Sequence, residues 1–167
     1  TAAENTAVGT SSMSATTTGA SNAAFGTDSL AANTTGASNT ALGAYSLDAN
    51  TTASNNTAVG VHSLGANTTG TQNVAVGQNA GAAVTTGTRN TIVGTLAGDA
   101  ITTGANNEAF GYGALTTNIL GSRSTAIGTA ALLTQNPASA ADMYTVAVGY
   151  EPQAFKTPSS VVLQVML

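Results

Sequence analysis

Apolar and polar positions follow one another along this chain in a pattern with a 17-residue period. Each unit contains a short run of Asn, Thr, Ala, an apolar residue and Gly, and the spacing of the glycine holds through eight occurrences. These glycines are Gly9, Gly26, Gly43, Gly60, Gly77, Gly94, Gly111 and Gly128. A fixed short period is typical of architectures in which equivalent units stack on one another. The pattern therefore predicts a solenoid of 17-residue coils.

The three residues before each of these glycines are expected to form a short strand, as at 40–42. The last residue of the strand is always apolar, and we expect this column to line the core of the coil. The column comprises Val8, Phe25, Leu42, Val59, Val76, Val93, Phe110 and Ile127. The residue before it is Ala in all but one unit, where Ile92 stands, and strand alternation places it on the opposite face. Because both faces are apolar, we expect one inside the coil and the other against a second chain.

Two further columns complete the unit. A second apolar column contains Met13, Leu30, Leu47, Leu64, Leu115 and Leu132. Gly81 and Gly98 interrupt it, and we expect Val84 and Ile101 nearby to repack the core there. An asparagine precedes each strand, at Asn5, Asn22, Asn39, Asn56, Asn73, Asn90 and Asn107, until Ser124 replaces it. Stacked asparagines of this kind are expected to form a hydrogen-bonded ladder along the rod axis.

The fold class follows from these columns. β-branched Thr and Val, turn-forming Asn and a glycine in every unit oppose helix, so the chain is expected to be all-β. We predict a parallel β-solenoid, or β-roll, whose 17-residue coils each hold two short strands and two turns. The alternative is a three-sided helix made of six-residue segments, because three such segments give a coil only one residue longer than the observed period. Eight coils at about 4.8 Å each give a rod roughly 40 Å long.

Composition narrows the classes of partner. Hydrophobic residues make up 42% of the chain and the net charge is −4, which disfavours disorder. Side chains this small bury little surface, so copies are expected to pack or intertwine as a homotrimer. Seven acidic against three basic residues exclude a phosphate-neutralising stripe, and hence nucleic acid. No apolar stretch is long enough for membrane insertion, and the absence of cysteine excludes disulfides and thiolate metal sites.

The repeat changes after Gly128, because the next equivalent glycine, Gly149, comes four positions later than the period requires. We place the extra residues in a protruding loop within 134–142. The expected organisation is a regular shaft over 1–128, an irregular last coil with an inserted loop over 129–149, and a C-terminal cap or junction strand over 150–167. The pattern is expected to end beyond Tyr150, and the start at Thr1 shows no signal-peptide pattern.

Candidate chemistry is sparse, and we predict no catalytic residue, cofactor or metal site. The column two residues past each glycine varies most, and its members Asp28, Tyr45, His62 and Asn79 form a candidate surface-binding stripe. Plain exposed surface is the alternative interpretation of this stripe. Asp48 and Asp99 share a column three coils apart, as Arg89 and Arg123 do two coils apart, and neither pair indicates an active site. The four Asn-X-Thr sequons arise from the repeat itself and are interpreted as coincidence.

The units Gln72-Asn73-Val74-Ala75-Val76-Gly77 and Tyr144-Thr145-Val146-Ala147-Val148-Gly149 resemble the head repeats of trimeric autotransporter adhesins. That resemblance implies a left-handed parallel β-roll wound into a trimer. The longer unit is even more similar to the Asn-Thr-Ala-Val-Gly arrays of phage and large-virus tail fibres, over residues 1–149. Such arrays often precede a self-cleaving chaperone domain. The 17-residue unit, and the absence here of an anchor or coiled-coil stalk, favour the virion fibre.

We therefore expect a non-enzymatic fibre or adhesin segment of a virion or cell surface. Its expected partners are further copies of itself and a host surface glycan or receptor. A bacterial trimeric adhesin head is one alternative. Ice or surface binding is another, because Thr18, Thr35, Thr52, Thr69, Thr86 and Thr103 form a regular column, with Asn or Thr two residues before most of them as a second column. A glycan-degrading fibre enzyme would need paired acids, which the chain lacks.

Overall fold

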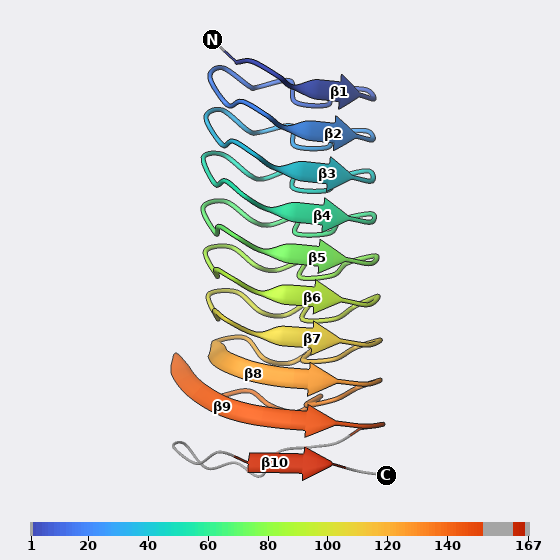
Figure 1. Cartoon of the computed structure of the whole chain (residues 1–167), viewed down its shortest axis with the longest axis vertical. Helices are drawn as coiled ribbons and strands as arrows, with labels where there is room; N and C mark the ends of the chain where they lie inside the picture. Colours follow the sequence, from blue (N-terminus) through green and yellow to red (C-terminus); the bar gives the residue numbers. More distant parts are fainter. Residues whose placement is uncertain (1, 152–161, 166–167) are drawn as a thin grey trace.

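The chain forms a rod of stacked coils, and successive coils contribute successive strands to one parallel sheet (Figure 1). The computed structural model describes residues 2–151 and 162–165. The strands in these ranges are β1 (Thr6–Val8), β2 (Ala23–Phe25), β3 (Thr40–Leu42), β4 (Thr57–Val59), β5 (Val74–Val76), β6 (Thr91–Val93), β7 (Glu108–Phe110), β8 (Gly121–Ile127), β9 (Ala141–Val148) and β10 (Val162–Val165). The expected all-β parallel solenoid of 17-residue coils is confirmed.

Neighbouring strands pair in strict register, so that each residue lies beside its equivalent in the next coil. Ala41 of β3 pairs with Ala58 of β4, which in turn pairs with Ala75 of β5. Two strands per coil were expected, and this was wrong for the regular coils, each of which contains a single three-residue strand. The rest of each coil consists of turns and bends.

Left-handed backbone conformations explain why the wall opposite the sheet is not a strand. Tyr45 and Leu47 have φ angles of 58° and 50°, which lie outside the extended region. Consecutive turns form instead, in which the Ser46 N–H donates to the Gly43 carbonyl at 3.3 Å and the Asn50 N–H to the Leu47 carbonyl at 3.1 Å. The intervening amides point along the axis and bond the neighbouring coils, so the turn wall stacks as regularly as the sheet does.

We expected the larger apolar column of the strands to line the core of the coil, and this was wrong. The alanine column points inward, and Ala24, Ala41 and Ala58 are fully buried. The larger residues point outward, with Leu42 48% exposed and Phe25 40% exposed. So short a coil is narrow, and its interior is already occupied by one leucine from the turn wall. Only a small side chain fits opposite that leucine.

The core is repacked where that leucine is missing. Val84 and Ile101 are fully buried, as is Ile92, which replaces the usual alanine. A Cβ atom added at Gly98 would lie 2.9 Å from Ile101 Cδ1 and 3.2 Å from Ile92 Cδ1. These side chains therefore fill the space that a leucine occupies in the other coils, as the sequence predicted for Val84 and Ile101 but not for Ile92.

An asparagine ladder joins the coils, which confirms the expected axial hydrogen bonding. Asn56 is typical: its Oδ1 accepts from the Asn73 backbone N–H at 2.9 Å, and its Nδ2 donates to the Gly70 carbonyl at 2.9 Å. The same side-chain-to-backbone bond recurs at every step from Asn5 to Ser124. Each amide thus connects the strand of one coil to the strand of the next and to the turn that lies between them.

A shorter ladder runs through the other side of the interior. The Asn50 Nδ2 donates to Asn33 Oδ1 at 2.9 Å, and the Asn67 Nδ2 to Asn50 Oδ1 at 3.0 Å. The ladder ends where Val84 takes the next position, which leaves Asn67 Oδ1 buried without a hydrogen-bond partner among the described residues. These three asparagines are also sequon residues. Because they are buried and engaged, only the fourth sequon, at the exposed Asn55, could carry a glycan on the folded chain.

Glycine follows each strand from β1 to β9, and Gly43 shows why it is required. Its φ of 137° is outside the range that other residues adopt readily. A Cβ atom there would also lie 2.6 Å from the Gly60 carbonyl carbon of the next coil. The glycine column therefore allows both the sharp corner and the close approach of successive coils.

The C-terminal coils depart from the regular unit. β8 and β9 are longer than the other strands and pair through an irregularity between Ser122 and Ser124. Asp142 was expected in the protruding loop but belongs to β9. The exposed part of the insertion is therefore confined mainly to residues 134, 136 and 138–140.

The pairing period resumes after the insertion. Val162 of β10 lies beside Thr145 of β9, which is the same offset as between regular coils. The repeat was expected to end beyond Tyr150. The residue types of the repeat do end there, but the strand pairing continues to β10. Most of the C-terminal cap or junction strand expected over 150–167 falls on residues 152–161 and 166–167, which lie outside the described part of the chain.

Replacing Gly43 by alanine should prevent folding or destabilise the rod by more than about 1 kcal/mol, because the backbone is left-handed and the next coil is too close. The matched control is Gly65→Ala, since Gly65 does not have a positive φ. Urea unfolding followed by circular dichroism measures both. Equal stability of the two variants would contradict the role given to the glycine column.

Ile92→Ala should cost about 2–5 kcal/mol, because two neighbouring coils lack the leucine that would limit the cavity. Gly98→Leu alone should also destabilise, by crowding Ile92 and Ile101. Combining the two substitutions should recover part of the loss, which a double-mutant cycle of unfolding free energies detects. Simple additivity would show that these residues do not share one space.

Candidate surface-binding site

The candidate stripe lies on the corner that follows the sheet. Asp28, Tyr45, His62 and Asn79 occupy equivalent places in four consecutive coils, with φ angles between 53° and 58°. Tyr45 and His62 are exposed, whereas Asp28 and Asn79 are half-exposed. Their equivalents Gly113 and Ala130 show that the corner forms with little or no side chain. The structure thus brings the four predicted residues into one surface row.

Two aromatic rings stack within this row. The Tyr45 and His62 ring centroids lie 4.8 Å apart, and the ring planes differ by 7°. The spacing of successive coils suits stacked rings, so the fold itself sets this arrangement. The stack limits the rotation of His62 and fixes the position of its imidazole edge on the surface.

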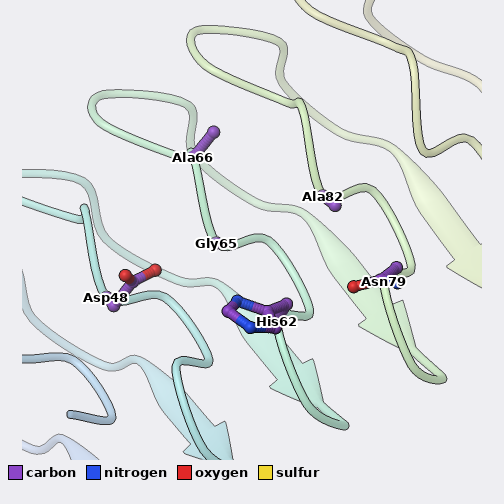
Figure 2. Close-up of a pocket in the computed structure, with 6 residues that line it drawn as sticks. All are labelled: Asp48, His62, Gly65, Ala66, Asn79 and Ala82. Carbon is purple, nitrogen blue, oxygen red and sulfur yellow. The ribbon is translucent and has the colours of Figure 1, made fainter.

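A shallow depression of about 400 Å³ lies beside His62 (Figure 2). Asp48, His62 and Asn79 supply its polar groups, and Gly65, Ala66 and Ala82 supply the rest of its lining. The residues come from three successive coils. Figure 2 shows the imidazole between the Asp48 carboxylate on one side and the Asn79 amide on the other. The depression therefore offers an acceptor, an imidazole and an amide within a small area.

Sequence reasoning missed Asp48, which it paired with Asp99 as a column that does not indicate an active site. Burial raises the pKa of Asp48 above its usual 3.8, while backbone N–H groups and nearby His62 act in the opposite direction. The carboxylate is therefore partly desolvated. The signal that could have found it is local: Asp48 follows Tyr45 by three residues, on the same turn wall, and its neighbour one coil on is Gly65.

Gly65 opens the depression. It lies in the column of Asp48, and a Cβ there would lie 3.3 Å from Asp48 Oδ1. Its backbone does not have a positive φ, so the conformation does not demand glycine at this place. The missing side chain exposes the flank of the carboxylate to a ligand.

The other acid of this column, Asp99, is not part of a comparable arrangement. Burial raises the pKa of Asp99 above 3.8 as well, and its Oδ1 atom has no hydrogen-bond partner among the described residues. Leu96 and Gly113 stand beside Asp99 where Tyr45 and His62 stand beside Asp48, so no aromatic stack forms there. Asp99 is therefore a useful comparison for Asp48.

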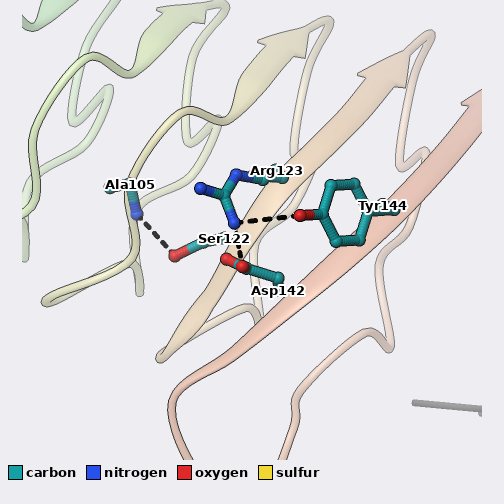
Figure 3. A network of polar contacts seen from close by, with 5 residues as sticks. All are labelled: Ala105, Ser122, Arg123, Asp142 and Tyr144. Atoms are coloured by element: carbon teal, nitrogen blue, oxygen red, sulfur yellow. Dashed lines mark hydrogen bonds and ion pairs between the residues drawn. The ribbon is translucent and has the colours of Figure 1, made fainter. Parts of the chain in front are cut away.

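The two arginines expected to share a column make separate contacts. The Arg89 Nε donates to Gln72 Oε1 at 3.1 Å. Arg123 forms an ion pair with Asp142 and donates to the Tyr144 hydroxyl at 3.1 Å (Figure 3). The contacts of Arg123 join β8 to β9 and hold the irregular coil against the shaft.

The threonine column considered for ice binding is exposed in all six coils from Thr18 to Thr103. The second column considered with it is not: Asn33, Asn50 and Asn67 are fully buried, as is Val84. These side chains point into the coil because they close its interior. The expected two-column flat face does not form there.

Metal-binding and membrane-spanning features were considered for the described ranges, 2–151 and 162–165. No group of three or more His, Cys, Asp or Glu side chains in them is placed to hold a metal ion. They contain no helix long and apolar enough to cross a membrane. Comparison with protein families, curated proteins and solved structures finds no match to this chain. The geometry of the rod and of its surface therefore carries the functional argument alone.

Proposed function

We propose that this chain is a structural segment of a surface fibre or adhesin of a virion or cell. It forms a stiff rod that assembles with further copies as a homotrimer and presents a binding surface on its exposed corner. The observation that supports this most strongly is the apolar outer face of the sheet.

That face is apolar although the coil interior is already complete. The exposed column includes Val8, Leu42, Phe110 and Ile127, which are 55%, 48%, 39% and 42% exposed. It continues through the half-exposed Val59, Val76 and Val93, so no coil from β1 to β8 interrupts it. A continuous apolar stripe of this length is uncommon on a monomer and is typical of an interaction surface.

A second copy of the same rod suits this face better than an irregular partner. The stripe is straight and recurs with the strand spacing, and an equivalent rod carries the same spacing. In a parallel homotrimer each coil would meet the equivalent coils of its partners, which closed cyclic symmetry requires. Charge repulsion between copies would be small. In the outward-facing strand column from Thr6 to Thr125, Glu108 alone is charged, and the Thr125 hydroxyl donates a hydrogen bond to it at 2.6 Å.

The remaining surface suits presentation of a ligand site. The corner row from Asp28 to Asn79 faces away from the coil interior and is not needed for folding. Assembly would repeat the row on each copy, so weak contacts could add through multivalency. Ice binding is not proposed, because only a single exposed threonine column remains for it.

The assembly is tested by analytical ultracentrifugation of the purified chain. We expect a species of three times the 16.1 kDa chain mass. Leu42→Glu should dissociate it while circular dichroism stays unchanged, because Leu42 points out of the coil. Thr52→Glu, at the far turn, is the matched control and should leave the assembly intact. A folded monomer at every concentration, or equal dissociation by both variants, would refute the proposal.

A further inference from the structure

Tyr45 and His62 stand where the fold gives no reason for a ring. Both have left-handed backbone conformations, which disfavour bulky residues, and Gly113 meets the same requirement without strain. The coils that carry the two rings are already joined by strand pairing, so the stack is not needed to hold them together. The rings are therefore available to contact a ligand.

The polar groups of the depression are held in place before any ligand arrives. The ring of Tyr45 covers one face of His62. Burial raises the pKa of the half-buried Asp48 carboxyl, while hydrogen bonds from the backbone N–H groups of Asp48 and Ala49 act in the opposite direction and help to hold the carboxyl in place. The coil spacing sets the distance between the Asp48 and Asn79 coils. A preorganised set of this kind loses little conformational entropy on binding.

The shape of the depression restricts the ligand to a small, flat group. Gly65, Ala66 and Ala82 make a low floor, and the depression is open to solvent. A carboxylate accepts hydrogen bonds from hydroxyls, and an amide both accepts and donates. Adjacent hydroxyls of a pyranose ring need this combination, and the His62 imidazole, which is the ring of the stacked pair that lines the depression, adds contact for the ring carbons.

Charge selects among such ligands. Asp48 lies in the depression and Asp28 lies close enough to act on it electrostatically, so two carboxylates stand against the single imidazole of His62, which acts on Asp48 in the opposite direction. Arg89 and Arg123 are engaged with Gln72 and with Asp142, outside the residues that line the depression. An anionic sugar would therefore be repelled, whereas a neutral one would not.

From this geometry we infer that the depression formed by Asp48, His62, Gly65 and Asn79 binds a neutral pyranose unit of a surface glycan. The inference rests on the proposed adhesin function and specifies its ligand class. Because the depression is shallow, one site binds weakly, with a Kd of about 1–10 mM for a monosaccharide. Repetition of the site over an assembly supplies the avidity that adhesion needs.

His62 is the only histidine of the chain, so its imidazole proton signals report on this site directly in an NMR titration. The probes are the methyl glycosides of glucose, galactose, mannose and N-acetylglucosamine, with N-acetylneuraminic acid as the anionic comparison, all at constant pH. We expect at least one neutral glycoside to shift the His62 signals saturably, and N-acetylneuraminic acid to have no such effect.

Two variants test the assignment. Asp48→Asn should weaken binding of the active glycoside at least tenfold, and Gly65→Ala should weaken it by raising the floor. Asp99→Asn, the matched control three coils away, should leave binding unchanged. Circular dichroism confirms that each variant is folded.

The inference is overturned if no neutral glycoside shifts the His62 signals, if N-acetylneuraminic acid binds equally well, or if Asp48→Asn has no larger effect than Asp99→Asn. Ultracentrifugation of the same samples separates this outcome from failure of the proposed function. A trimer without glycoside binding leaves the rod in place and removes the ligand class. Glycoside binding by a monomer would keep the ligand class and remove the trimeric rod.

Discussion

Hydrogen bonding along the rod axis, from the residues of each coil to those at or next to the equivalent positions of the neighbouring coil, is the interaction on which the other features of this chain depend. Strand amides, turn amides, asparagine side chains and threonine hydroxyls all bond across this step. Thr34 Oγ1, for example, donates to the Thr51 carbonyl at 3.0 Å. Because every coil must present the same contour to the next, each column admits few residue types unless its side chains point outward.

The same constraint decides which apolar residues are buried. Coils that rise only about 4.8 Å per turn enclose a thin interior, and the leucine of the turn wall fills most of it. Where that leucine is present the strand can therefore contribute only alanine, and its larger apolar residues lie outside. Folding therefore fills the interior of one chain but leaves an apolar face of the sheet exposed. In this way the packing of Ala58 and Leu64 in the interior is connected to the proposed assembly.

Several features were predictable because they depend on the period alone. The glycine column, the asparagine ladder and the repacking at Val84 and Ile101 all follow from comparing equivalent positions. The inward direction of the alanines did not follow, because alternation separates two faces without saying which is inside. Size suggested the wrong face, since a larger apolar residue is usually the buried one. The turn wall was missed because Tyr45 and Leu47 do not look left-handed from residue type.

The candidate site was also predictable only in part. The row of Tyr45 and His62 was found from its variability between units, which marks an outward position. Asp48 was missed because its importance depends on the absent side chain of Gly65 in the next coil. A depression of this kind is defined by neighbours across coils, and the sequence of a single unit does not contain it.

Thiol labelling of two adjacent positions tests most directly which strand face is inside, and the chain has no cysteine of its own to interfere. Ala58→Cys and Val59→Cys are compared at dilutions where no association is detected. The inward alanine column predicts that the half-exposed thiol at 59 reacts in the folded rod, whereas the thiol at 58 reacts only when the rod unfolds. Faster reaction at 58 than at 59 would contradict this account of the core and of the outer face.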